Sequence, residues 1–466
     1  MNADLENHII KSADKFKELC TKTKIIRCIT HLDADGLCAG AIVANILRNL
    51  GSDFHLSIVK QLNNENIEDF SKEKYDFYIF SDLGSGQLEA IKNNLLSKGK
   101  YVAVLDHHEI KAKIEHENLI HVNPHIFGID GSNNISGSGV CYLLSRHIIK
   151  DDLSHLAITG ALGDMQEKDG FSGLNEEILK NAISKGKIKV EKGLNVFGRV
   201  SRPIHKALEY CTEPEIPGVT GDESGTIQFL SEVGIDIKNK NNDFRRLCDL
   251  NGDEMQRVIN AIIIKRAGSN YEKPHKDIVS NIYISDDENE NLADLREFAT
   301  VLNACGRSEY PAVAMMLCMG DKEKGLKIAK GLSNSYRKKI MESIKLLKRN
   351  KEKVIKTEKT FYIVGKDDID EKLIGTICSI SLNSDNLCDK KIIVGFANTS
   401  ANTIKISTRT KEQNINLKRI ISDITAKLGG EGGGHSVAAG GEIPKGKEEE
   451  FINMFENQIK EIYNDC

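Results

Sequence analysis

Several residue types and patterns are scarce in this chain. Tryptophan is absent, and aromatic residues make up only 6% of the 466 residues, so few side chains can stack on a flat ligand. No stretch approaches 18 uninterrupted apolar residues, and we therefore expect no membrane-spanning helix. The first 20 residues mix acidic and basic side chains without the apolar core of a signal peptide.

Paired-cysteine motifs are missing as well. The 11 cysteines are odd in number, scattered, and never spaced as C-x-x-C. This usage argues against a disulfide scaffold and a zinc ribbon, and it fits the reducing cytoplasm. The net charge of −4 means that a polyanionic partner would have to bind a local basic patch. We expect a cytoplasmic enzyme, with enough apolar residues for two or three domains.

Residues 24–40, KIIRCITHLDADGLCAG, predict a strand, a tight turn and a helix. The β-branched run ends in His31, Asp33 and Asp35, and the carboxyl ends of strands are where open α/β sheets place ligands. Asp33 and Asp35 alternate with the strand period, so we expect them to point the same way. Two neighbouring carboxylates repel unless they share protons or hold a cation. The alternative is a simple turn with an Asx cap.

The same pattern recurs further along the chain. The strand-like YDFYIF leads to Asp82, YVAVL leads to Asp106, His107 and His108, and an apolar, helix-compatible segment ends at Asp164. Carboxylate-rich sites with one or two imidazoles suit divalent ions such as Mn²⁺ and Mg²⁺. A bridging carboxylate with several terminal ligands suits two-metal hydrolysis. The series therefore predicts a metal site assembled from four elements.

These motifs resemble those of the DHH phosphoesterase superfamily. The four matching segments are DADG at residues 33–36, SDLG at 81–84, DHH at 106–108 and GD at 163–164. The segment GGEGGGHSVAAGG at residues 429–441 resembles the glycine-rich signature of the DHHA1 domain that follows the DHH domain in this superfamily.

Three segments in the middle of the chain narrow the resemblance. They are FGRVSRPIHKALEY at 197–210, IPGVTG at 216–221 and LNACGR at 302–307, and they resemble archaeal RecJ-type exonucleases, including the GINS-associated nuclease. The resemblance covers nearly the whole chain.

The resemblance implies an α/β fold: a parallel-sheet DHH domain, a smaller α/β DHHA1 domain and a mostly helical insertion between them. Strand-like and helix-like runs alternate up to about residue 170, which favours the parallel sheet. We expect a DHH catalytic domain at 1–170 and an insertion at 171–325 that completes the DHH lobe. A basic linker helix at 326–358 and a DHHA1 substrate-binding domain at 359–466 would follow.

Roles for individual side chains also follow from the resemblance. Asp82 would bridge two cations, for which Mn²⁺ and Mg²⁺ are the candidates. Asp33 would hold one cation, and Asp35, His107 and Asp164 would hold the other. The reaction implied is hydrolysis of a phosphodiester bond.

Three further residues are expected to take part in catalysis beside the cations. His108 would donate a hydrogen bond to the phosphate, and Asp106 would orient a ligand from behind. Many phosphatases of the superfamily place a histidine four residues before the first aspartate, but this chain has Ile29 there. His31, two residues before Asp33, is the candidate to take that role, and occupancy of the first cation site stays open.

The C-terminal domain is expected to bind the phosphates of the substrate. A glycine run lets the backbone approach a ligand, and its N–H groups can form an anion-binding concavity; a floppy loop is the alternative. Because aromatic residues are scarce, backbone electrostatics should dominate the affinity, which would fall steeply with salt. The contacts expected from this domain are Arg409, Gly432, Gly433, Gly434 and His435, and Arg307 is expected to add a contact from outside it.

The leading hypothesis is a metal-dependent exonuclease of single-stranded DNA or RNA in replication or repair, with the GINS complex as a candidate partner. One alternative is a phosphodiesterase of small substrates: nanoRNA, cyclic dinucleotides or 3′-phosphoadenosine phosphate. Another is a replication scaffold like Cdc45, which the intact ligand set disfavours as the sole role. Cleavage polarity, DNA against RNA, and the working ion stay open.

Three segments have two interpretations each. The loop at 128–139 either presents N–H groups to a phosphate at a helix N-terminus or is a connection with a good N-cap. The basic residues Arg199, Arg202, His205 and Lys206 either form a solvated helix face or contact DNA. The basic helix at 327–353 either lines a groove for a strand backbone or is an ordinary lysine-rich surface helix.

Overall fold

The computed structural model describes residues 3–168, 170–269, 271, 273–286, 292–308, 310–321, 323–384, 387–412 and 414–464. The chain divides into two compact units. The first unit comprises Met1–Ile204, Lys238–Met255 and Val279–Asn334. The second unit comprises His205–Ile237, Gln256–Ile278 and Ser335–Cys466.

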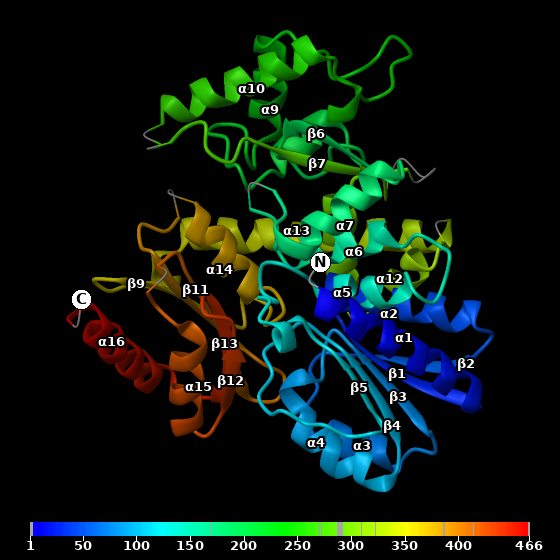
Figure 1. The fold of residues 1–466 in the computed structure, drawn as a ribbon. Coiled ribbons are helices and arrows are strands. Elements are labelled where there is room, and N and C mark those ends of the chain that lie inside the picture. Colours follow the sequence, from blue (N-terminus) through cyan, green and yellow to red (C-terminus); the bar gives the residue numbers. More distant parts are fainter. Residues whose placement is uncertain are drawn as a thin grey trace. The chain divides into compact units, whose positions relative to one another are not determined.

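A five-stranded parallel sheet is the centre of the first unit (Figure 1). Its strand order is β2-β1-β3-β4-β5. Because parallel neighbours require crossover connections, a helix or loop segment separates each pair of strands in the sequence. The strands are β1 (Ile25–His31), β2 (Asp53–Val59), β3 (Phe77–Ser81), β4 (Tyr101–Leu105) and β5 (Leu119–Val122).

Both faces of this sheet are buried, as expected for parallel strands with apolar side chains on both sides. One face, with Ile26 and Cys28, packs with α1 (Ala3–Lys22), α2 (Ala34–Asn49), α5 (Gly137–Ser145) and α6 (Ser154–Gly163) in one apolar core. The opposite face, with Ile29 and Tyr78, packs with α3 (Asn64–Lys72) and α4 (Leu88–Asn94). The short 3₁₀ turns nearby are η1 (Ser85–Gln87), η2 (Leu96–Lys98) and η3 (Pro124–Phe127).

The rest of the first unit adds helices and a two-stranded antiparallel sheet. Strands β6 and β7 pair directly although residues 195–278 lie between them in the chain. The elements are α7 (Gly173–Ser184), β6 (Ile188–Leu194), η4 (Leu247–Asp249), β7 (Val279–Ser285), α11 (Leu295–Arg307), α12 (Pro311–Cys318) and the first part of α13 (Lys324–Arg349).

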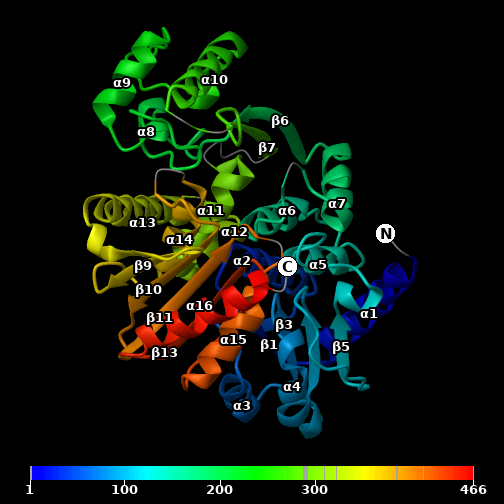
Figure 2. The same ribbon diagram turned by 90° about the vertical axis from the view of Figure 1, so that its left-hand side faces the viewer.

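A six-stranded mixed sheet of order β12-β13-β11-β10-β9-β8 is the centre of the second unit. Helices α15 and α16 cover one face (Figure 2), and α14 with the second part of α13 packs on the other. The elements are η6 (Lys351–Lys353), β8 (Val354–Lys356), β9 (Thr360–Lys366), α14 (Ile374–Asn383), β10 (Ile392–Asn398), β11 (Thr403–Thr410), α15 (Leu417–Lys427), β12 (Glu431–Gly434), β13 (Ala438–Pro444) and α16 (Glu448–Asn464).

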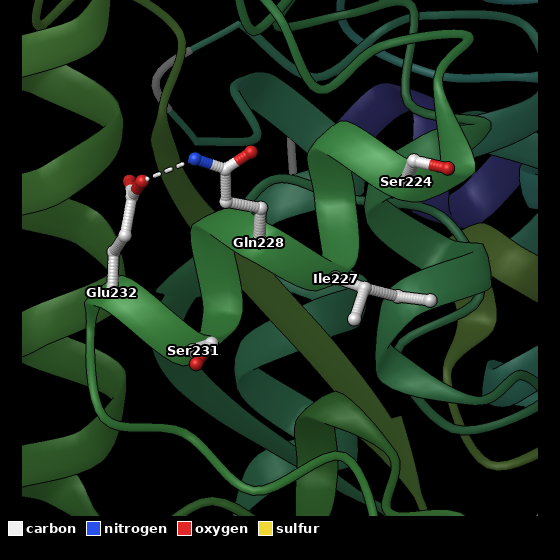
Figure 3. Close-up of a pocket in the computed structure, with 5 residues that line it drawn as sticks. All are labelled: Ser224, Ile227, Gln228, Ser231 and Glu232. Carbon is white, nitrogen blue, oxygen red and sulfur yellow. Dashed lines mark hydrogen bonds between the residues drawn. The ribbon is translucent and has the colours of Figure 1, made fainter.

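Three helices lie in the part of the sequence between the strands of the five-stranded sheet and those of the six-stranded sheet. They are α8 (Ile204–Glu209), α9 (Glu223–Glu232) and α10 (Gly252–Ala267). An open hollow follows one face of α9, where Gln228 donates a hydrogen bond to Glu232 at 2.9 Å (Figure 3). None of the residues that line this hollow was expected to take part in catalysis. None of the described helices is both long and apolar enough to span a bilayer.

The basic residues before α8 do not form one solvated helix face. Arg199 and Arg202 precede the helix and are buried in the first unit. Arg202 donates to Asn334 Oδ1 at 2.8 Å and lies over the ring of Phe197, while Arg199 is 3.4 Å from Glu191. These two guanidinium groups therefore have structural partners within their own unit.

Candidate metal centre

Strand β1 ends at His31, so the two aspartates of DADG do not continue the strand. Asp33 is the N-cap of α2, and its Oδ1 accepts a hydrogen bond from the Gly36 N–H at 3.0 Å. Asp35 is one residue inside the helix and is buried. The prediction that the two aspartates alternate along a strand is therefore wrong, because the helix begins at Ala34, between them.

The N–H groups at the start of α5 bind a carboxylate of the protein itself. Gly137 donates to Asp35 Oδ2 at 2.6 Å and Ser138 donates to Asp35 Oδ1 at 3.0 Å. Ser136 caps the helix by accepting from the Gly139 N–H at 3.1 Å. The N-cap interpretation of this loop is confirmed, and two N–H groups at the start of the helix bind the carboxyl group of Asp35 rather than being left for a phosphate.

Asp82 lies directly after β3, at the carboxyl edge of the sheet. Its backbone adopts a left-handed φ of 60°, which is uncommon for a non-glycine residue. Its carboxylate is buried, and Oδ1 has no hydrogen-bond partner. Leaving a buried carboxylate oxygen without a donor is costly, so this atom requires a proton or a cation.

His107 faces this oxygen with its own lone pair. Its Nδ1 lies 2.8 Å from the Gly131 carbonyl, and because a carbonyl only accepts, Nδ1 carries the hydrogen. In the neutral ring, Nε2 then carries the lone pair, and it lies 3.3 Å from Asp82 Oδ1, 3.8 Å from Asp164 Oδ2 and 3.9 Å from Asp35 Oδ2. A divalent cation is the group that several converging lone pairs accommodate.

A second group of ligands shares Asp82. His31 Nδ1 is 3.0 Å from Asp33 Oδ2 and 3.6 Å from Asp82 Oδ2. Ile29 has no ligand atom and is buried against α3 and α4. The potential ligand atoms form three overlapping sets, each within 4.8 Å: Asp82, Asp106, His107 and His108; His31, Asp33 and Asp82; and Asp35, His107 and Asp164.

Asp106 is already saturated with hydrogen bonds. Its Oδ1 accepts from the His107 and His108 backbone N–H groups and lies 2.8 Å from His108 Nδ1, while Oδ2 accepts from the Ser85 N–H. Despite burial, the imidazoles of His108 and His107 and the Ser85 N–H lower the pKa of Asp106. This carboxylate therefore orients the ring of His108, whose side chain is 40% exposed.

Two glycines provide the space for the buried carboxylates. A Cβ on Gly137 would lie 2.3 Å from Asp82 Oδ1, and a Cβ on Gly160 would lie 2.3 Å from Asp35 Oδ1. Both distances are far below van der Waals contact, so any side chain there would displace a ligand. The helices α5 and α6 are thus built to approach the acidic cluster closely.

The density of negative charge shifts the proton equilibria of the cluster. Burial and the neighbouring Asp82 carboxylate raise the pKa of Asp35 to about 8, and burial raises that of Asp164 to about 6. Burial alone would lower the pKa of His107, but the carboxylates of Asp82, Asp164 and Asp35 raise it. Protons would be held here without a cation, and the donor set fits Mn²⁺ or Mg²⁺.

Helix α11 holds the DADG loop from the far part of the sequence. Asn303 Oδ1 accepts a hydrogen bond from the Ala34 N–H at 3.0 Å, between the two aspartates. A Cβ on Gly306 would lie 1.9 Å from the Leu32 carbonyl oxygen. The LNACGR motif contains both residues and the expected contact Arg307, but its role in supporting this loop could not be inferred from the chain alone.

In the second unit, the expected substrate contacts gather at one end of the mixed sheet. Arg409, the residue before the last of β11, lies opposite Ala438, and Gly434 of β12 lies opposite Ala439. The Arg409 guanidinium is oriented by Ser379 Oγ and Ser407 Oγ, both at 3.1 Å, and by the Thr408 carbonyl at 2.7 Å. The glycine run is therefore a strand, Glu431–Gly434, followed by His435, and not a floppy loop.

Comparison with known proteins identifies the class. Models of the DHH family N-terminal domain, the DHH-CID domain and the DHHA1 domain match residues 25–162, 196–279 and 357–461. The chain belongs to the DHH/DHHA1 phosphoesterase superfamily. An uncharacterized protein of Methanocaldococcus jannaschii is 35% identical over 445 residues, which cover 94% of this chain and 93% of that protein.

Solved structures share the fold at low sequence identity. Cdc45 from Entamoeba histolytica has a TM-score of 0.66 at 9% identity, over 97% of this chain and 98% of that one. RecJ in complex with Mn²⁺ from Thermus thermophilus has a TM-score of 0.58 at 16% identity, over 97% of this chain but 54% of that one. The chain thus spans about half the length of that RecJ. The predicted fold class is confirmed.

Substitution Gly137→Ala should abolish Mn²⁺ binding, because the new Cβ would lie 2.3 Å from Asp82 Oδ1. Alanine is otherwise the better residue in a helix, so the loss would come from the displaced ligand. Isothermal titration with Mn²⁺ measures it. Gly86→Ala, where a Cβ meets nothing within 4 Å, is the matched control and should bind normally. Unchanged binding by Gly137→Ala would contradict the proposed ligand set.

Mn²⁺ binding should release protons at neutral pH, and its affinity should fall between pH 8 and pH 6. The reason is that the raised pKa values of Asp35, about 8, and Asp164, about 6, make protons compete with the ion for the same oxygens. Calorimetry in buffers of different ionisation enthalpy counts the released protons. A binding enthalpy that does not depend on the buffer would show that these carboxylates are not ligands.

Proposed function

We propose that this protein is a metal-dependent exonuclease of the archaeal RecJ type that hydrolyses phosphodiester bonds in single-stranded DNA or RNA. One observation carries the proposal: Asp82 links two groups of converging ligand atoms. It belongs to the group with His31 and Asp33, and its buried Oδ1, which has no hydrogen-bond donor, lies 3.3 Å from Nε2 of His107 in the group with Asp35 and Asp164. Such paired, carboxylate-bridged groups are the arrangement that two-metal phosphoryl chemistry uses.

The residues divide the chemistry between them. Asp82 would bridge two cations; His31 and Asp33 would complete one site, and Asp35, His107 and Asp164 would complete the other. Two Mn²⁺ or Mg²⁺ ions, when bound, would activate a water at neutral pH and neutralise charge on the phosphate oxygens. His108, oriented by Asp106 at 2.8 Å, donates a hydrogen bond to a non-bridging phosphate oxygen.

The second unit supplies phosphate recognition in this proposal. Arg409 is pre-oriented by hydrogen bonds, and a guanidinium so fixed suits a phosphate oxygen pair. The Gly432–Gly434 backbone, His435 and, in the first unit, Arg307 add further contacts to a strand. Part of the positive charge of α13 is neutralised within the protein, because Lys348 pairs with Glu215 at 3.1 Å and Lys339 lies 3.6 Å from Asp370. These two lysines therefore carry less weight as contacts to a strand.

Two other functions are compatible with the same fold and ligand set. The fold shared with Cdc45 favours a place in a replication complex, and we infer that binding to GINS would coexist with catalysis, because the ligand set is intact. Hydrolysis of small substrates such as nanoRNA, cyclic dinucleotides or 3′-phosphoadenosine phosphate uses the same chemistry. The segment of α8–α10 between the sheets favours a longer substrate, since small ligands do not require it.

Substitution Asp82→Asn or His107→Ala should abolish nucleotide release from end-labelled oligonucleotides in Mn²⁺ while strand binding persists. The charge of Asp82 and the lone pair of His107 hold the cations, whereas the strand is bound largely by other residues. Asp69→Asn, the same change at an exposed aspartate of the first unit, should leave turnover unchanged. Near-native Mn²⁺-dependent turnover in either site variant would rule out the assignment.

Substitution Arg409→Ala should raise KM for a long oligonucleotide by about ten- to a hundredfold with a smaller change in kcat, because a hydrogen bond to a charged group contributes about 1.5–3 kcal/mol. Arg419→Ala, on the exposed side of α15, is the matched control. In the same assay under limiting enzyme, faster turnover of a trinucleotide than of the long strand would favour the small-substrate alternative.

A further inference from the structure

A buried glutamine stands beside the acidic cluster and was not among the expected site residues. Gln166 follows Asp164 by two positions, after the chain reverses at Met165 with a φ of 57°. The Gln166 N–H donates to the Ala161 carbonyl at 3.0 Å, which closes the end of α6. Its side chain reaches back, and Nε2 donates to Asp164 Oδ2 at 3.0 Å.

The same amide group reaches the support of His107. Gln166 Nε2 donates its second hydrogen to the Gly131 carbonyl at 2.9 Å, and His107 Nδ1 lies 2.8 Å from that carbonyl. The Gly131 oxygen thus receives both donors. This arrangement fixes the hydrogen of His107 on Nδ1 and leaves Nε2 directed at the carboxylates. One amide therefore contacts one candidate ligand directly and supports the orientation of another.

Asn175 of α7 determines which way round the Gln166 amide lies. Its Nδ2 donates to Gln166 Oε1 at 2.7 Å, and its backbone N–H donates to the Asn134 carbonyl at 2.8 Å. With Oε1 occupied in this way, Nε2 must face Asp164 and Gly131. The opposite orientation would place the amide oxygen against two acceptors. Both Gln166 and Asn175 are buried.

We propose that Gln166, held by Asn175, is a positioning residue of the candidate metal centre that fixes Asp164 and His107 for cation binding. The inference rests on the proposed function, because it assumes the same ligand set. A neutral amide suits the position: it donates to Asp164 without adding charge. A carboxylate would add another negative group, and an apolar side chain could not donate.

Substitution Gln166→Met keeps the length of the side chain and removes the donors. Mn²⁺ affinity measured by isothermal titration should fall about 10- to 100-fold, as is typical when a partner behind a metal ligand is lost. Saturating Mn²⁺ should restore most of kcat, since Asp164 and His107 remain. Gln166→Glu keeps the volume of the side chain but repels Asp164, so it should also weaken Mn²⁺ binding. This variant replaces Gln166→Met in the test if the methionine variant does not fold.

Two comparisons separate positioning from general stability. Asn175→Ala should weaken Mn²⁺ binding in the same direction, and the double variant should be no weaker than Gln166→Met alone, because Asn175 acts through Gln166. Ile178→Val, one turn further along α7 at a buried apolar position, should lower the melting temperature without changing Mn²⁺ affinity.

The inference is overturned if folded Gln166→Met binds Mn²⁺ as the wild type does, or if Ile178→Val weakens binding equally. Additive effects of the Gln166 and Asn175 substitutions would also contradict it. A wild-type protein that binds Mn²⁺ but does not hydrolyse any strand would refute the proposed exonuclease, while the binding comparison among these variants would still decide the role of Gln166.

Discussion

Repulsion among buried carboxylates is the constraint on which the rest of the first unit depends. Asp35 and Asp82 are almost fully buried within reach of His107, and the Oδ1 of Asp82 has no hydrogen-bond donor. Like charges that close together cannot all remain ionised without compensation. A parallel sheet provides a natural place for them, because all its strands end at the same edge, where side chains from distant segments meet.

Beside the imidazoles, neutral donors compensate part of this charge. Backbone N–H groups of Gly137 and Ser138 bind Asp35, and the Ser85 N–H binds Asp106. The Gln166 amide binds Asp164. Such donors stabilise a carboxylate but leave its remaining lone pairs available, whereas a lysine ammonium would compete with a cation for the same oxygens. Neutral donors around the carboxylates therefore favour a site that can bind a cation over a permanent network of ion pairs.

Much of this could be predicted from the sequence, and the limit has a physical reason. Each of the motifs around Asp33, Asp82, His107 and Asp164 follows an apolar element, so periodicity alone places it at an element's end. The position of Asp33 and Asp35 was predicted wrongly, because the periodicity of a strand does not say where it stops. The helix starts at Ala34 because the Asp33 side chain caps it by accepting a hydrogen bond from the Gly36 N–H.

The supporting residues were beyond prediction because their partners are distant in the chain. Asn303 reaches Ala34 across 269 positions, and no local pattern marks an asparagine on an amphipathic helix as the partner of a loop. In the sequence, nothing distinguishes Gly137 and Gly160 from other small residues. The need for glycine follows only from the short distances to Asp82 and Asp35 in the folded protein. The identity of the ligands thus follows from local sequence motifs, whereas their geometry depends on tertiary contacts. Solved structures share the fold at 9–16% identity, and a shared fold does not by itself determine the geometry of a site.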